Sequence, residues 1–186
     1  DAVVRESRSI ADEFAKAGRR LYLVGGIVRD LLVEPALETD DPDFDFTTDA
    51  PPAEIKRIVG PISESLWTQG ERFGTIGAVH QGRRYEITTH RAESYDAASR
   101  KPRVNYGTDL RADLARRDFS INAIAIEVTA TTPEIIDPYD GRADLLARRL
   151  RTPIAPAESF SDDPLRMLRA ARFIARFALT ADPDVT

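Results

Sequence analysis

The stretch LYLVGGIVRDLLVEPALETDDPDFDFTT, residues 21–48, contains the features that decide the fold. An apolar segment ends at Val24, immediately before the pair Gly25-Gly26. The apolar residues that follow have the spacing of one helix face: Ile27, Val28, Leu31 and Leu32. A strand, a glycine turn and a short helix are therefore predicted. Glycines let a backbone approach a ligand closely, and a helix N-terminus favours an anion, so the turn is either a phosphate cradle or only a turn.

Two carboxylates, Asp43 and Asp45, belong to a second predicted strand in the same stretch. Because side chains alternate along a strand, these two share one face, while Phe44 and Phe46 share the other. Crowded carboxylates repel each other unless a cation neutralises them, and Mg²⁺ prefers carboxylate oxygens together with substrate phosphates. A cradle beside such a pair predicts nucleotidyl transfer. A solvated strand edge is the alternative for the pair alone.

The composition is that of a globular chain of 186 residues, with 42% hydrophobic and 31% charged residues. No apolar run approaches the ~18 residues that span a bilayer. We therefore expect no membrane segment and no signal peptide, with the cytoplasm as the default compartment. The absence of cysteine excludes disulfides and zinc–thiolate sites. A net charge of −5 argues against a broad basic surface for nucleic acid.

Periodicity and turn residues predict the elements around this stretch. A helix is expected over residues 3–17, capped by Gly18, and a second over residues 53–59 after Pro51-Pro52. Strands are expected over residues 64–69, 75–80 and 83–89, the last two joined by the turn Gln81-Gly82.

Glu86 lies in the second strand of this hairpin, with apolar neighbours on the opposite face. A third carboxylate on a neighbouring strand would complete the metal site, and a solvent-facing glutamate is the alternative. Trp67 is interpreted as a core residue rather than a ligand contact. His80 and His90 lack metal-ligand spacing and are interpreted as surface or hairpin residues.

Residues 91–107 lack a sustained period and predict a loop, either a mobile connector or a segment that closes over a nucleotide. A helix over residues 109–117 leads into RRDFSINA, residues 116–123. Its paired arginines with Asp118 and Asn122 could bind phosphate and ribose hydroxyls, and a salt-bridged helix end is the alternative. Short strands are predicted over residues 125–128 and 134–137.

From residue 145 the pattern becomes helical, and residues 163–178 predict the clearest helix of the chain. Its apolar positions share one face, with Arg169, Arg172 and Arg176 roughly opposite. We therefore expect a sheet domain over residues 1–145 and a helical region over residues 146–186.

Six motifs occur in a familiar order: Gly25-Gly26-Ile27-Val28-Arg29-Asp30, Asp43-Phe44-Asp45, Glu86-Ile87-Thr88-Thr89, residues 116–123, residues 137–145 and Asp162-Asp163-Pro164-Leu165-Arg166. Together they resemble the class II tRNA nucleotidyltransferases and bacterial poly(A) polymerases of the DNA polymerase beta superfamily, over about residues 20–178. The resemblance implies an α+β fold: a polymerase-beta-like head, with a mixed sheet and flanking helices, over residues 1–145. The start of an all-helical neck, which recognises the nucleotide base, would occupy residues 146–186.

The resemblance also implies roles for particular residues. Asp43 and Asp45 would bind Mg²⁺, with Glu86 as an assisting catalytic carboxylate. The residues that would hold the nucleotide are Gly25, Gly26 and Arg29 at the triphosphate, and Arg117, Asp118 and Asn122 at the sugar and phosphates.

The base would be recognised by Asp163 and Arg166, in a family pattern Glu-Asp-x-x-Arg that has Asp162 at its first position here. Residues three apart on a helix are neighbours, and this pair offers an acceptor and a donor. Cytosine and adenine both present an amino donor beside a ring-nitrogen acceptor, whereas guanine and uracil present the opposite order. An ordinary helix-end ion pair is the alternative interpretation.

The activity implied by the resemblance is template-independent, Mg²⁺-dependent addition of CCA, or part of it, to the 3′ end of tRNA from CTP and ATP. The hairpin FGTIGAVHQGRRYEITTHR, residues 73–91, is more similar to CCA-adding members than to poly(A) polymerases. Addition of poly(A), of CC only and of A only are alternative activities that the sequence leaves open. A catalytically silent RNA- or nucleotide-binding module is a further alternative, against which the intact Asp43 and Asp45 argue.

Overall fold

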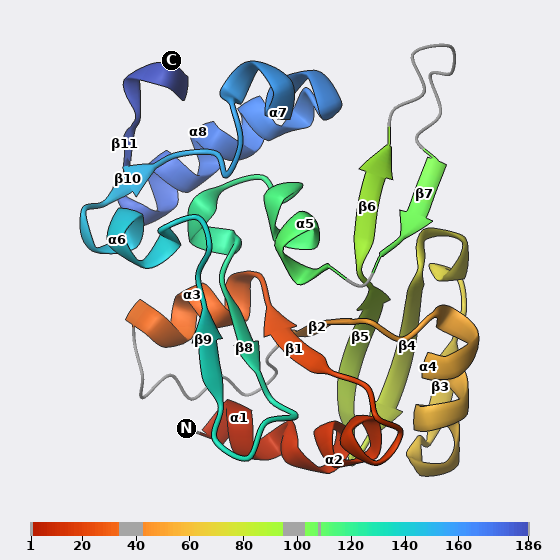
Figure 1. The fold of residues 1–186 in the computed structure, drawn as a ribbon. Coiled ribbons are helices and arrows are strands. Elements are labelled where there is room, and N and C mark those ends of the chain that lie inside the picture. The colour runs from red at the N-terminus through yellow and green to blue at the C-terminus, as the bar shows by residue number, and fades with distance from the viewer. Residues whose placement is uncertain (1, 34–42, 95–102, 108, 186) are drawn as a thin grey trace.

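The computed structural model describes residues 2–33, 43–94, 103–107 and 109–185. Within these ranges the central element is a mixed sheet with the strand order β3-β4-β5-β2-β1-β8-β9 (Figure 1). Its strands are β1 (Leu21–Val24), β2 (Phe44–Thr48), β3 (Ser65–Trp67), β4 (Thr75–His80), β5 (Arg83–Thr89), β8 (Ala125–Glu127) and β9 (Glu134–Ile136). Strands β2 and β5 run parallel, and the other neighbours are antiparallel. The predicted mixed sheet and the 75–89 hairpin are confirmed.

Four helices contribute to the core on one face of this sheet: α1 (Ala2–Glu6), α2 (Arg8–Lys16), α3 (Gly26–Val33) and α4 (Pro52–Val59). The helix predicted over residues 3–17 is interrupted at Ser7, whose hydroxyl donates to the carbonyl of Val3 at 2.9 Å. Such local side-chain hydrogen bonds compete with regular helix geometry. The helices expected after Gly25-Gly26 and after Pro51-Pro52 are confirmed.

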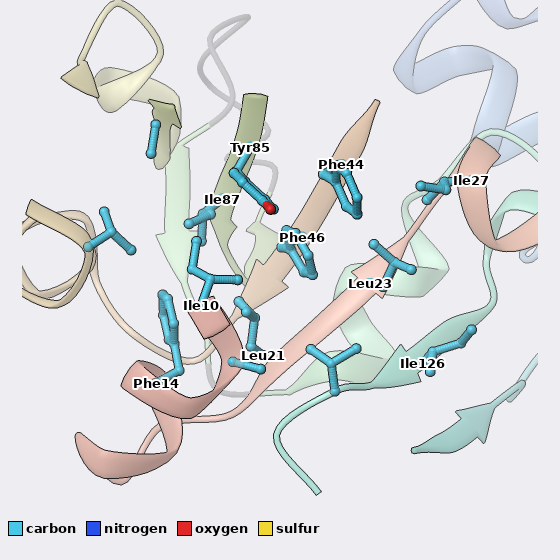
Figure 2. Packing of buried hydrophobic residues seen from close by; sticks show 14 of the residues in the cluster. Ile10, Phe14, Leu21, Leu23, Ile27, Phe44, Phe46, Tyr85, Ile87 and Ile126 are labelled. Atoms are coloured by element: carbon cyan, nitrogen blue, oxygen red, sulfur yellow. The ribbon is translucent and has the colours of Figure 1, made fainter. Parts of the chain in front are cut away.

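Aromatic and aliphatic side chains fill the space between the sheet and these helices (Figure 2). Phe44 and Phe46 of β2 face Tyr85 of β5, with the Phe44 and Tyr85 rings 4.9 Å apart between centroids. Ile10 and Phe14 of α2 pack on the same cluster. The alternation predicted for residues 43–46 is confirmed, since both phenylalanines of β2 are buried while the carboxylates beside them are exposed.

The opposite face of the sheet is covered over β1 and β8 by α5 (Leu110–Ala115), through Leu114 packed on Val24 and Ala125. Short 3₁₀ turns complete this region and the loops: Gly60–Ile62, Glu71–Phe73, Ser120–Asn122 and Pro183–Val185. On the same face, Asp45 of β2 and Glu86 of β5 are exposed. The site described below therefore lies beside α5, on the face that the core does not use.

The C-terminal part contains α6 (Gly141–Leu146), α7 (Pro156–Asp162), α8 (Leu165–Phe177) and the parallel pair β10 (Arg149–Leu150) and β11 (Thr180–Ala181). Phe119 packs with Leu150 and Ala170 in a separate apolar cluster, so α8 lies against the loop that follows α5. The predicted domain boundary near residue 145 stays a prediction.

The helix predicted over residues 163–178 begins two residues later than expected. Asp163 has extended backbone angles, φ −145° and ψ 98°, and separates α7 from α8. The cause is Pro164, because a proline disfavours helical geometry in the residue before it. Asp163 therefore lies outside the helix that contains Arg166, whereas the sequence pattern predicted both residues on one helix.

Two other interpretations are wrong. The segment 91–107 is not wholly a loop, because β6 (Arg91–Ser94) and β7 (Arg103–Tyr106) form an antiparallel hairpin. Its middle, residues 95–102, lies outside the described residues, as does the suggestion that it closes over a nucleotide.

His80 and His90 are buried, so the interpretation as surface residues is wrong, although His80 does lie at the end of the β4–β5 hairpin. The ring of His80 bonds to the Ser9 hydroxyl and the Ile62 carbonyl, and that of His90 to the Thr47 hydroxyl. Burial lowers the pKa of His90. No helix in the described ranges is both long enough and apolar enough to span a membrane.

Candidate active site

The parallel pairing of β2 and β5 brings two carboxylates together. Asp45 is directly opposite Glu86 in the register of these strands. Asp43 precedes Asp45 by two residues and is likewise exposed. The third carboxylate that the sequence suggested on a neighbouring strand is therefore next to the pair in space.

Gly25 lies between this carboxylate and a guanidinium. Its φ of +80° is a left-handed conformation that glycine adopts without strain. A Cβ at this position would be 3.6 Å from both Asp45 Oδ2 and Arg117 Nη1. A side chain here would enter the space between the two charged groups, so the glycine keeps that space open.

Arg117 follows α5 and has donors that the protein does not use. Its Nη2 donates to Asp113 Oδ2 at 3.5 Å, and its Nε is buried without a hydrogen-bond partner among the described residues. Burial lowers the pKa of Arg117, and the charge of Asp113 opposes that shift. A buried donor without a partner is costly, so an anionic ligand at this position would stabilise the site.

Asp45 is destabilised in its charged form. Desolvation and the nearby charge of Glu86 raise its pKa to about 6, Asp43 adds to the rise, and Arg117 opposes it. A bound cation would reverse this shift, because an opposite charge favours the carboxylate.

The available ligands fit a magnesium site to which both protein and substrate contribute, rather than a site formed by protein side chains alone. Among the described residues no group of three His, Asp or Glu side chains is arranged to hold a metal ion. Mg²⁺ commonly uses one or two carboxylates and takes its remaining ligands from water and substrate phosphates. Asp43 and Asp45 meet that requirement, and Glu86 lies beside them as an additional negative charge.

Arg29 is held by protein groups. It is only 5% exposed, donates from Nη1 to Asn122 Oδ1 at 2.7 Å and pairs with Asp30. Its guanidinium also lies over the rings of Phe177 and Phe173, at 4.5 and 5.4 Å from their centroids. Arg29 thus connects α3, which begins at the glycine turn, to α8.

Asp118 is similarly engaged. Its Oδ1 accepts from the Phe119 amide at 2.8 Å and from Asn122 Nδ2 at 3.0 Å, and its Oδ2 accepts from Arg169 Nε at 2.8 Å. The predicted sugar-binding residues Asp118 and Asn122 therefore form one network with Arg29 and α8.

These residues enclose a cleft of about 370 Å³. Its lining is Gly25, Gly26, Arg29, Asp43, Asp45, Arg117, Asp118, Asn122, Arg169, Arg172, Phe173 and Arg176. The α8 residues were not predicted as part of the site. Their signal was the spacing of the three arginines at i, i+3 and i+7, which places them on one helix face.

A second cleft of about 430 Å³ adjoins the first and shares Asp43 and Asp45 with it. Its other lining residues are Phe44, Trp67, Arg84 and Glu86. Trp67 was interpreted as a core residue, but it is only partly buried and lies on the side of the carboxylates.

The side chains of Asp163 and Arg166 are joined by no hydrogen bond or ion pair in the described structure, although the Arg166 amide donates to the Asp163 carbonyl at 3.0 Å, and neither residue lines the first cleft. Asp163 Oδ1 accepts from the Leu165 amide at 3.0 Å. Arg166 donates to Ser159 Oγ at 2.7 Å and to the Arg116 carbonyl at 2.6 Å. Arg166 is thus bonded to the backbone of the residue that precedes Arg117.

A mixed sheet with a carboxylate pair beside a glycine turn has the architecture of a nucleotidyltransferase head domain. Comparison of sequences agrees: the family described as "Poly A polymerase head domain" matches residues 21–151. The chain belongs to this family.

Two similar proteins are named CCA-adding enzyme. The chain is 38% identical over 176 residues to the CCA-adding enzyme of Lactobacillus johnsonii, covering 94% of the chain and 42% of that protein. It is 37% identical over 180 residues to the CCA-adding enzyme of Geobacillus kaustophilus, again 42% of that protein. The chain therefore spans less than half the length of these relatives.

Solved structures give the same result. The Bacillus stearothermophilus CCA-adding enzyme in complex with CTP superposes with a TM-score of 0.81 at 34% identity, over 97% of this chain and 41% of that chain. The Thermotoga maritima CCA-adding enzyme complexed with tRNA superposes with a TM-score of 0.76 at 27% identity, over 98% of this chain and 40% of that chain.

Proposed function

We propose that the protein is a template-independent RNA nucleotidyltransferase that adds CCA, or part of it, to the 3′ end of tRNA from CTP and ATP. One observation carries the proposal: Asp45 and Arg117 face each other across Gly25 in a cleft that also contains Asp43. This arrangement offers negative charge for a cation and unpaired donors for a phosphate within one cavity. The relatives named CCA-adding enzyme support the choice of substrates.

The protein groups have distinct parts in this proposal. The glycine turn and Arg117 bind the triphosphate, because both line the cleft, and a helix N-terminus and a guanidinium each favour an anion. The arginines of α8, above all Arg172 and Arg176, add positive charge along the same wall. Arg29 positions that wall, since its donors are held by Asn122 and Asp30.

The carboxylates Asp43 and Asp45 would hold Mg²⁺, with Glu86 assisting as a nearby negative charge. Bound there, the ion would favour the ionised 3′-hydroxyl of the RNA and stabilise charge on the departing pyrophosphate. The raised pKa of Asp45 is consistent with a carboxylate that has no protein cation sufficient to neutralise it.

Base choice by Asp163 and Arg166 is part of the proposal and requires a rearrangement. Arg166 donors that bond to Ser159 and to the Arg116 carbonyl must be released before they can reach a base. Release would also free the backbone beside Arg117. Base recognition and phosphate binding would then be coupled through the Arg116-Arg117 pair.

The test uses the protein and tRNA that lacks its 3′ end, with each of the four nucleoside triphosphates and Mg²⁺. We expect incorporation of C and A, with little of U or G, and product sequencing should give CCA or part of it. Arg166→Ala should slow CTP and ATP use together, since an unpaired buried polar group costs about 1–3 kcal/mol. The quantity to compare is kcat/KM for each nucleotide.

Other outcomes would replace the proposal. Long A tracts would indicate a poly(A) polymerase, and addition of only CC or only A would indicate a specialised relative. Absence of any Mg²⁺-dependent incorporation by well-folded protein would favour a silent RNA- or nucleotide-binding module.

A further inference from the structure

Four residues form one row across the sheet. Trp67 pairs with Gly77, Gly77 with Glu86, and Glu86 with Asp45, in the registers of β3–β4, β4–β5 and β5–β2. Residues directly opposite each other on neighbouring strands share a face of the sheet. The indole of Trp67 is therefore on the face of the two carboxylates, with only a glycine between it and Glu86.

Gly77 lets the indole lie across the sheet. A Cβ on Gly77 would be 1.7 Å from Trp67 Cε2 and 2.1 Å from Nε1, so the ring occupies the space that any other residue at position 77 would fill. The indole is thereby fixed beside the cleft, with its nitrogen bonded to none of the described residues. A rigid, partly exposed aromatic ring is a platform on which a nucleobase can stack.

Arg84 supplies a free cation on the same face. It lies two residues before Glu86 on β5, is exposed, and lines the second cleft with Trp67. Its side chain makes no hydrogen bond or ion pair with any residue that the structure describes. By contrast, Arg83 beside it pairs with Glu6 at 3.3 Å. A guanidinium without a protein partner is suited to a phosphate group.

We propose that the second cleft binds the 3′-terminal nucleotide of the acceptor RNA, with its base stacked on Trp67 and its 5′ phosphate paired with Arg84. The inference rests on the proposed nucleotidyl transfer and names the acceptor side of that reaction. The nucleotide to be added occupies the first cleft. The terminal 3′-hydroxyl then lies at the carboxylates that both clefts share, which is where transfer requires it.

The charge of the second cleft favours an RNA end over a triphosphate. Asp43, Asp45 and Glu86 supply three carboxylates to its lining, and Arg84 supplies a single guanidinium. A triphosphate would place several negative charges against these carboxylates. A terminal nucleotide brings one phosphate and a neutral hydroxyl, so its charge matches that of the cleft.

Trp67 is the one tryptophan of the sequence, so its fluorescence reports this cleft directly. The protein, in EDTA to prevent transfer, is titrated with a short single-stranded RNA ending in a 3′-hydroxyl. We expect saturable quenching. The same RNA with a 3′-phosphate should bind at least several-fold more weakly, because its added charge faces the carboxylates. CTP alone should quench less than the RNA does.

Steady-state kinetics provide the second measurement. Trp67→Ala should raise KM for the RNA about tenfold, the lower part of the range for loss of one stacked base, and leave KM for CTP unchanged. Trp67→Phe should restore most of the RNA affinity. Arg84→Ala should raise KM for RNA several-fold. It should also reduce the slope of log KM against log salt concentration by about the amount that one phosphate contact contributes.

Arg142→Ala is the matched control for charge, because Arg142 is exposed on α6 and lines a different cavity. It should leave the KM for RNA and its salt dependence unchanged. Should Trp67→Ala fail to fold, Arg84→Ala and the fluorescence titration still decide the question.

The outcomes separate this inference from the proposed function. Quenching requires binding only, so it would persist in a protein that adds no nucleotide. An active enzyme whose Trp67 fluorescence is unaffected by RNA would overturn the inference and leave the proposed function standing. Quenching by CTP stronger than by RNA, or a raised KM for CTP in Trp67→Ala, would assign the cleft to the nucleotide instead.

Discussion

The two faces of strand β2 have opposite properties. On one face Phe44 and Phe46 are at most 2% exposed and pack against Tyr85 and the helices behind the sheet. On the other, two residues that alternate with them in sequence, Asp43 and Asp45, are exposed carboxylates beside Glu86. The apolar face has all its partners within the protein. The carboxylate face does not, since the charged form of Asp45 is disfavoured in the folded chain.

This difference shows which side chains of the protein are still able to bind a ligand. A core side chain that already has its contacts stabilises the fold and has nothing left to offer a substrate. The groups at the site are Asp45, Arg117 with its unpartnered Nε, and Arg84 with no described partner. The same rigid strand thus serves both purposes, since its apolar face holds the carboxylates in place.

The largest predicted effect is a loss of catalytic activity when the carboxylate face of β2 is altered. Asp43→Ala or Asp45→Ala should lower nucleotide addition by a factor on the order of 10³ or more, because metal-assisted stabilisation contributes several kcal/mol and each ~1.4 kcal/mol is tenfold. The melting temperature should stay within a few degrees of the unchanged protein. Asp12→Ala, an exposed carboxylate on α2, is the control and should keep full activity. Substantial Mg²⁺-dependent activity in either site variant would refute the metal assignment.

The opposite face should respond in the opposite way. Phe46→Ala should lower the free energy of unfolding by about 3–5 kcal/mol, the usual loss for a buried phenylalanine. Below the unfolding transition, activity per folded molecule should fall far less than in the carboxylate variants, because Asp43 and Asp45 are both still present. Urea denaturation gives the stability, with Phe73→Ala as the matched control, because Phe73 is 46% exposed and its loss should cost less than about 1 kcal/mol. If both variants lost a comparable free energy of unfolding, the buried face of β2 would contribute no more to stability than an exposed phenylalanine does.

Much of β2 and its surroundings follows from local sequence. Alternation in Asp43-Phe44-Asp45-Phe46 was enough to assign both faces, and the glycine pair was enough to predict the turn and α3. These features depend on residues near each other in the chain. The pairing of Asp45 with Glu86, by contrast, depends on strand order, which placed the hairpin beside β2.

Other features could not be predicted because they depend on distant partners. The binding of Arg29 to Asn122 and its contact with Phe177 required α8 to lie across the cleft. Burial of His80 and His90 required hydrogen-bond partners from separate elements, among them the Ser9 and Thr47 hydroxyls. Trp67 looked like a core residue by type, and only the glycine opposite it in β4 shows why it lies beside the carboxylates.

The smallest predicted effect concerns the pH dependence of stability. Folding raises the pKa of Asp45 from 3.8 to about 6, so the folded chain binds this proton more tightly than the unfolded chain. The stability that the neutral carboxyl contributes is complete below about pH 4 and is lost as the pH rises through 6. Asp45→Asn should therefore melt at a higher temperature than the unchanged protein at pH 7.5 in EDTA, by a few degrees. The two should converge near pH 4.

Adding Mg²⁺ and CTP to this measurement tests the central claim, that the carboxylate face lacks a partner which a cation and nucleotide supply. At pH 7.5, Mg²⁺ with CTP should raise the melting temperature of the unchanged protein more than CTP alone does. Asp45→Asn should lose this Mg²⁺-dependent increment. An equal increment in both proteins, or an Asp45→Asn variant that is no more stable than the unchanged protein in EDTA, would contradict the account.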